Sequence, residues 1–171
     1  MLSNEEAHKA LSAFGKKVVI RARRGFTKNR FTGKGSRSIS YQISKNAKGF
    51  DFYFKMLPYV WFQDAGVKGA KSSKNRSKYI NGIKRDFKYT NKMPPPRVFD
   101  KWQVRKGIAP RDAQGRFVKR SAINYAIARS IYLYGIRPKL FFTKAFEKEI
   151  KFLPDELAEG FGFDIENMFG D

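Results

Sequence analysis

The sequence predicts an α+β fold, with a small, mainly antiparallel β-sheet flanked by an N-terminal helix and by C-terminal helices. Three observations predict this class. Apolar residues recur at helical spacing near the N-terminus, they alternate with polar residues between positions 38 and 56, and helical spacing returns after position 96. We expect one domain over residues 1–171, because this length suits a single core.

The first element is predicted to be a helix. Ser3 with Glu6 three residues later is a capping-box pattern. An apolar stripe follows at helical spacing: Ala7, Leu11, Phe14 and Val18. Gly25 is the predicted stop, and residues 26–35, rich in Gly, Lys and Arg, are predicted to form a mobile loop.

Two alternating segments then predict a β-hairpin. The first strand alternates at Ile39, Tyr41 and Ile43. The second alternates at Phe50, Phe52, Phe54 and Met56, after a turn over residues 45–49. Residues 59–62 are apolar and are predicted to form a third strand that ends near Gly66.

A long basic loop over residues 67–93 separates the two halves of the chain. Loops of this length in compact domains are usually functional or disordered. Whether residues 78–87 contain a short element stays open at this point.

The C-terminal half is predicted to be helical. Three prolines at 94–96 open a short helix that brings Val98, Phe99 and Trp102 together and closes at Gly107. A second helix over residues 121–134 carries an isoleucine stripe and stops at Gly135. The last helix has its stripe at Phe142, Phe146, Ile150 and Leu153, and an acidic, Phe-rich extension follows at 154–171.

Charge is the strongest compositional signal. The chain has 36 basic and 15 acidic residues, for a net charge of +21. Two acid-poor clusters, at 16–37 and 68–92, favour contact with nucleic acid or with an acidic protein. The candidate contact residues are Arg21, Arg23, Arg24, Lys28, Arg30, Lys34, Arg37, Lys68, Lys71, Lys74, Arg76 and Lys78. Nearby Phe26, Phe31 and Tyr79 could stack on bases, and a solvated surface is the alternative.

The composition argues against an enzyme. There is no cysteine and one histidine, His8, so the usual ligands of a zinc site are too few. The aspartates of the first two thirds are scattered along the chain, which disfavours a magnesium-dependent nuclease. We therefore expect no catalytic residue, metal or cofactor. The apolar runs are also too short for a membrane span.

The large apolar residues outside the hairpin are predicted to serve packing or subunit contacts. Tryptophans and phenylalanines among regularly spaced apolar residues belong to cores or interfaces more often than to ligand sites. The candidates are Trp61, Trp102, Phe142, Phe146 and Phe161.

Several short motifs occur in an order that resembles the neck and tail-completion (head–tail joining) proteins of tailed bacteriophages. Residues 59–66, YVWFQDAG, look like that family's strand ending in an acidic residue, any residue and Gly. After a variable loop, that family has a proline-led helix with Trp and a basic-Gly close, as at 94–107. A helix rich in Ala and Ile follows at 122–135, then a basic-Pro-x-x-Phe stretch at 137–142. The loop at 67–93 is long for that family, and the extension after Pro154 is additional.

The resemblance implies a structural virion protein that is assembled in the host cytoplasm. It implies copies arranged in a ring around the DNA conduit, contacts with portal, neck or tail proteins, and no catalysis. We also expect non-specific contact with genomic DNA and no membrane partner. The alternative is a basic nucleic-acid-binding module of the ribosomal or nucleoid type.

Overall fold

The computed structural model describes residues 4–27, 33–46, 49–71, 79–80, 83–84, 87–155 and 157. It confirms the α+β class, with helices and three two-stranded antiparallel sheets. In chain order the elements are α1 (Asn4–Thr27), α2 (Lys34–Ser38), β1 (Ser40–Asn46), β2 (Gly49–Lys55), α3 (Pro58–Ala65), β3 (Val67–Lys68), β4 (Tyr79–Ile80), β5 (Ile83–Lys84), the 3₁₀ turn η1 (Pro96–Phe99), α4 (Asp100–Arg105), α5 (Arg120–Tyr134), β6 (Gly135–Ile136) and α6 (Phe141–Ile150).

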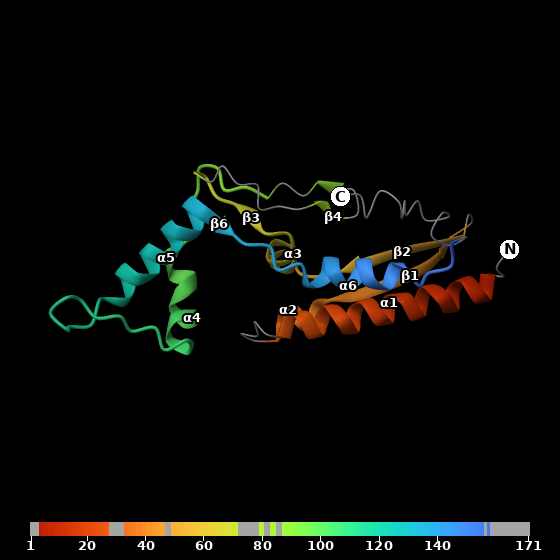
Figure 1. Cartoon of the computed structure of the whole chain (residues 1–171), viewed down its shortest axis with the longest axis horizontal. Coiled ribbons are helices and arrows are strands. Elements are labelled where there is room, and N and C mark those ends of the chain that lie inside the picture. The colour runs from red at the N-terminus through yellow and green to blue at the C-terminus, as the bar shows by residue number, and fades with distance from the viewer. Residues whose placement is uncertain are drawn as a thin grey trace.

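The larger part of the molecule, which we call the body, contains α1, α2, the β1–β2 hairpin, α3 and α6 (Figure 1). Helix α6 lies along α1, and the hairpin packs against the same pair. Residues from the predicted apolar stripes of both helices form the core, together with Ile39, which follows α2, and Val60 of α3. Its members include Leu11, Phe14, Val18, Ile39, Val60, Phe142, Phe146, Ile150 and Leu153.

The hairpin is present with the predicted two-residue period. Strands β1 and β2 pair antiparallel from Ser40 opposite Lys55 to Asn46 opposite Gly49. Aromatic residues on one face of β2 are half-buried and pack on the core, while Asp51, Tyr53 and Lys55 are exposed. Alternation therefore identified both the strands and the face that meets the helices.

The predicted third strand is wrong, because residues 59–62 belong to helix α3. Pro58 occupies the first helical turn, where its fixed φ and missing N–H favour a helix start. The buried residues of α3 include Val60 and Asp64, one helical turn apart. Gly66 ends the helix with φ of 77°, a conformation that a side chain would strain.

Gly25 is not the end of the first helix, because α1 continues to Thr27. A Cβ at Gly25 would lie 2.9 Å from the Cβ of Phe141, so the glycine permits close contact between α1 and the start of α6. Phe26 is buried against the Phe141 ring, with centroids 4.9 Å apart, and is not available to stack on bases. The expected mobile loop also contains α2, which begins at Lys34. Ser3 and residues 28–32, which include Phe31, lie outside the described residues.

A narrow connection, which we call the waist, leads away from the body (Figure 1). It consists of β3, β6 and residues 87–89. Val67 pairs with Ile136 in antiparallel register, and Lys68 bridges Lys88 in parallel. Glycine is needed at position 135, because its φ is 76° and a Cβ would overlap the Val67 carbonyl oxygen. The expected long loop thus contains strands: β3, and the short pair β4 and β5.

Beyond the waist, residues 94–134 form an arm that projects from the body (Figure 1). Here η1 and α4 pack against α5, so the predicted helices are present. Gly107 has φ of 61° after α4, and Gly135 follows α5, as predicted. Within the described part of the chain, no helix has the length and apolarity needed to cross a membrane.

Candidate interaction surface

Exposed apolar side chains gather on the arm. Among the described residues, six of the twelve large apolar side chains that are exposed belong to it. They are Val98, Trp102, Val104, Phe117, Tyr125 and Tyr134. Contiguous exposed apolar surface is typical of sites that bind another macromolecule.

Trp102 shows how the arm differs from the body. The sequence left core packing and a subunit contact open for this residue, and in the structure η1 and α4 pack on α5. Trp102 keeps 37% of its surface exposed, which favours a subunit contact over a core position. The isoleucine stripe of α5 is only half-buried, and the fully buried residues of that helix are Asn124 and Ala128.

Between α4 and α5 lies an open groove of about 390 Å³, which we call the arm groove. Its walls are mainly apolar and include Val104, Ile108, Phe117, Val118 and Ile123. Gln103 also lines it, with only 2% of its surface exposed. The Gln103 Nε2 donates to the Ile108 carbonyl at 3.2 Å, but its Oε1 has no hydrogen-bond partner among the described residues.

A second buried amide lies nearby on α5. Asn124 Nδ2 donates to Asp100 Oδ1 at 3.3 Å, while Asn124 Oδ1 has no partner among the described residues. Most buried polar atoms in native proteins are paired, so two such oxygens on one arm need an explanation. Both atoms are acceptors, and neither receives a hydrogen bond within the part of the chain that the structure describes.

The tip of the arm is held in a defined conformation by Asp112. Its Oδ1 accepts hydrogen bonds from the backbone N–H groups of Gln114 and Arg116, and its Oδ2 accepts from Arg116 Nε at 3.0 Å. The Arg111 guanidinium lies 3.8 Å from the centroid of the Phe117 ring. The exposed Phe117 is therefore presented by an ordered turn.

The arm is also strongly basic, which the sequence analysis did not single out. Residues 94–134 contain nine Lys and Arg and two acids. Both acids are engaged within the arm: Asp112 at the tip, and Asp100 with Asn124 and Arg120. The imbalance is visible in the sequence, but the nine basic residues are spread over 41 positions and form no run.

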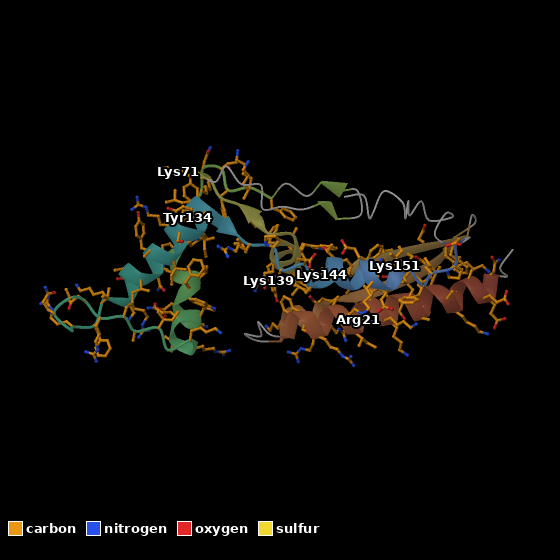
Figure 2. The ribbon with its side chains drawn as sticks, in the orientation of Figure 1. Arg21, Lys71, Tyr134, Lys139, Lys144 and Lys151 are labelled. Carbon is orange, nitrogen blue, oxygen red and sulfur yellow. The ribbon has the colours of Figure 1, made fainter. Side chains whose placement is uncertain are left out.

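The predicted basic residues do not form one patch. Arg21 is paired with the buried Glu149, at 2.6 Å from its Nε to Oε1, and Arg23 donates to the Ile39 carbonyl at 2.9 Å. Arg24, Lys34 and Arg37 lie exposed near the junction of α1 and α2. Lys68 and Lys71 belong instead to the waist and its edge, far from Arg21 in the view of Figure 2. Lys28, Arg30, Lys74, Arg76, Lys78 and Tyr79's side chain lie outside the description.

The predicted packing residues divide between the two regions. Phe142 and Phe146 are 1% exposed at the centre of the body, and the Trp61 ring lies 5.2 Å from that of Phe142. Core packing is therefore confirmed for these three. Phe161 falls outside the described residues.

Asp64 joins two of the motifs that carry the phage-family resemblance. Its buried carboxylate accepts from the backbone N–H of Phe142 at 2.7 Å and from the Thr143 hydroxyl at 2.5 Å. It thereby caps the N-terminus of α6, where unsatisfied N–H groups favour an anion. The segment 59–66 and the segment 137–142 thus meet at one point, although their residues are 78 positions apart. Apart from the two motifs themselves, no sequence pattern predicted this contact.

Partial burial shifts the pKa of two side chains, one in the waist and one beside it. Removal from water raises the pKa of Tyr89 and lowers the pKa of Lys139. Both shifts favour the uncharged form. In the described ranges, no three His, Asp or Glu side chains lie close enough to hold a metal ion. His8 is exposed and lies 5.6 Å from the Phe50 ring.

We found no significant match between the chain and a protein-family model, a curated protein or a solved structure.

Proposed function

We propose that this protein is a structural component of a tailed-phage particle, a neck or tail-completion subunit that joins head to tail. In this proposal several copies form a ring around the DNA conduit and contact portal, neck or tail proteins. The observation that carries it is the arm, which projects from a body with its own core. The arm exposes apolar side chains and contains two buried amide oxygens that have no donor among the described residues. Exposed apolar surface and unpaired buried polar atoms both cost free energy in the free protein. A protein partner can cover the apolar surface and supply hydrogen-bond donors.

The motif order supports the setting of the proposal. The acidic-x-Gly motif and the basic-Pro-x-x-Phe motif are physically coupled through Asp64, which holds the start of α6 against the end of α3. The hydrogen bonds from Phe142 and Thr143 to Asp64 give a structural reason why the two motifs occur together in the same chain. It supports the resemblance without depending on the helix or strand identity of residues 59–62.

Deletion of the gene from the genome that encodes the chain tests the proposal. Electron microscopy should then show filled heads and free tails that are not joined, and a plasmid copy should restore joined particles. Mass spectrometry of purified particles should detect the chain in the complemented preparation. Normal tailed particles that lack the chain would overturn the proposal.

The alternative, a nucleic-acid-binding module, is favoured by one observation, the excess of basic residues on the arm and in the chain as a whole. It predicts that the isolated protein binds duplex DNA or RNA with an affinity that falls steeply as salt is raised. Sequence-independent binding by a monomer, together with absence from particles, would favour this alternative.

A further inference from the structure

We infer that the arm groove of one copy binds the acidic, Phe-rich C-terminal segment, residues 158–171, of a second copy. The inference rests on the proposed function, since it specifies how copies of a ring subunit would contact one another. Four features carry it: the chemistry of the groove, the composition of the segment, their charges, and the place where the segment leaves the body.

The groove offers apolar walls and an acceptor that lacks a donor. Val104 and Phe117 are more than half exposed, at 56% and 64%. The buried Gln103 Oε1 has no donor among the described residues. A peptide backbone carries N–H donors along its length, and side chains of a bound segment can cover the walls. Gln103 Oε1 is closed to solvent in the free arm, so a shift of this side chain would bring the oxygen within reach of such a donor.

The segment has the complementary composition. It contains five large apolar residues, Phe161, Phe163, Ile165, Met168 and Phe169, and no Lys or Arg. Phe161, Phe163 and Ile165 are spaced by two, the pattern that presents three side chains to one surface when a peptide is extended. Aromatic residues of this kind are the usual anchors of protein interfaces.

The charges of the two surfaces are opposite. Residues 158–171 include four acids, Glu159, Asp164, Glu166 and Asp171. The arm carries nine basic residues, and its two acids are already engaged. Complementary charge steers encounter and disfavours wrong partners. Nucleic acid fits the groove less well, because phosphate oxygens are acceptors and cannot donate to Gln103 Oε1.

The direction of α6 favours a second copy over the same copy. Figure 2 shows Lys139 near the waist and Lys151 toward the opposite end of the body, so α6 runs away from the arm. The described part of the chain therefore ends toward the end of the body far from the arm (Figure 1). An arm that takes the tail of its neighbour makes a head-to-tail contact, which produces a ring when the rotation closes.

Self-association of the full chain tests the inference, measured by sedimentation and native mass spectrometry at low salt. Wild type should associate. An arm variant, Val104→Glu, and a tail variant, Phe161→Ser with Phe163→Ser, should each weaken association by about tenfold or more, as loss of a central apolar contact does. Ile20→Glu is the matched control, because it places the same charge on an exposed apolar position of α1 in the body.

Mixing the two variants distinguishes a second copy from the same copy. The arm variant keeps its tail and the tail variant keeps its arm, so the mixture should form dimers that cannot extend. A mixture that stays monomeric would overturn the inference, as would wild type that stays monomeric or variants that associate like wild type. Association that requires added duplex DNA would also overturn it.

Charge reversal provides a test that does not depend on how Val104→Glu folds. Lys106→Glu with Lys119→Glu should weaken association, and Asp164→Lys with Glu166→Lys in the same chain should restore it. Failure of the second pair to restore association would count against contact between arm and tail. The proposed function is judged separately by the deletion phenotype, so unjoined particles together with a monomeric protein would reject only the inference.

Discussion

Aromatic side chains occur in both the body and the arm, but their surroundings differ. In the body, the Phe142 ring lies 5.1 Å from Phe54 and 5.2 Å from Trp61, and Phe14 meets Phe146 at 5.6 Å. In the arm, Phe117 and Tyr125 have more than half of their surface exposed. These rings of the body are therefore covered within one copy, whereas Phe117 and Tyr125 are not. The body also has exposed aromatic residues, and Phe152 keeps 71% of its surface exposed.

Buried polar groups show the same contrast. In the body, Asp64 receives donors from α6, and Glu149 is paired with Arg21. In the arm, the buried amides of Gln103 and Asn124 each keep an acceptor that lacks a donor among the described residues. Among the described residues, the body therefore pairs its buried polar groups within one copy, whereas the arm keeps two buried acceptors without donors.

The largest expected effect contrasts one phenylalanine from each region. Phe142→Ala should destabilise the protein by about 3–5 kcal/mol, because it empties a fully packed position. Phe117→Ala should cost less than about 1 kcal/mol, because that ring is mostly exposed. Urea denaturation of the two variants measures both values. Equal losses would show that the arm is packed as tightly as the body.

The next effect is at the waist and uses two glycines with the same φ. Gly135 and Gly115 have φ of 76° and 77°, so alanine strains both by about 1–3 kcal/mol. Only at Gly135 does a Cβ also overlap backbone, whereas nothing lies within 4 Å of the Cβ at Gly115. Gly135→Ala should therefore cost more, by about 1–3 kcal/mol of overpacking.

Hydrogen exchange locates the damage at the waist. In the Gly135→Ala variant, amides of the arm and waist should exchange faster while those of α1 and α6 stay protected. Uniform loss of protection would mean that the arm and the body unfold as one unit, and the comparison between them would fail.

A smaller effect tests the polar pair of the body. Arg21→Gln should cost about 1–3 kcal/mol, because it leaves the buried Glu149 carboxylate without its cation. Lys17→Gln on the same helix is the control and should change the unfolding free energy by less than about 0.5 kcal/mol. Equal values would mean that Arg21 is ordinary solvated surface, as its place among the basic clusters of the sequence had allowed.

Local patterns predicted most of the body. Alternation located β1 and β2, and the stripe from Phe142 to Leu153 located α6, because burial of one face imposes these periods. The short apolar run at 59–62 was wrongly predicted to be a strand, because four consecutive apolar residues fit a strand or a helix equally well. Pro58 was the deciding residue, because its fixed φ favours the first turn of a helix.

Features that depend on distant residues were not predictable. Gly25 looked like a helix stop, but the reason for glycine there is Phe141, on an element near the other end of the chain. Trp102 has a helical neighbourhood typical of a core, and only the position of α5 relative to η1 and α4 leaves it exposed. Asp64 caps helix α6 through the backbone N–H of Phe142, 78 residues later in the chain.

The smallest expected effect compares two buried polar-to-apolar changes of similar volume. Thr143→Val in the body removes a donor from Asp64 and should cost about 1–3 kcal/mol, because the buried carboxylate keeps fewer hydrogen bonds. Gln103→Leu in the arm also removes a hydrogen bond, from Nε2 to the Ile108 carbonyl, worth about 1 kcal/mol. It removes at the same time the Oε1 that lacks a donor, and relief of that desolvated oxygen offsets the loss. The free protein should therefore change in stability by less than about 1 kcal/mol, while self-association, which would supply the missing donor, should weaken. Urea denaturation and sedimentation of the same preparation measure the two quantities. A stability loss as large as that of Thr143→Val would show that Gln103 serves the fold of the arm and not its partner.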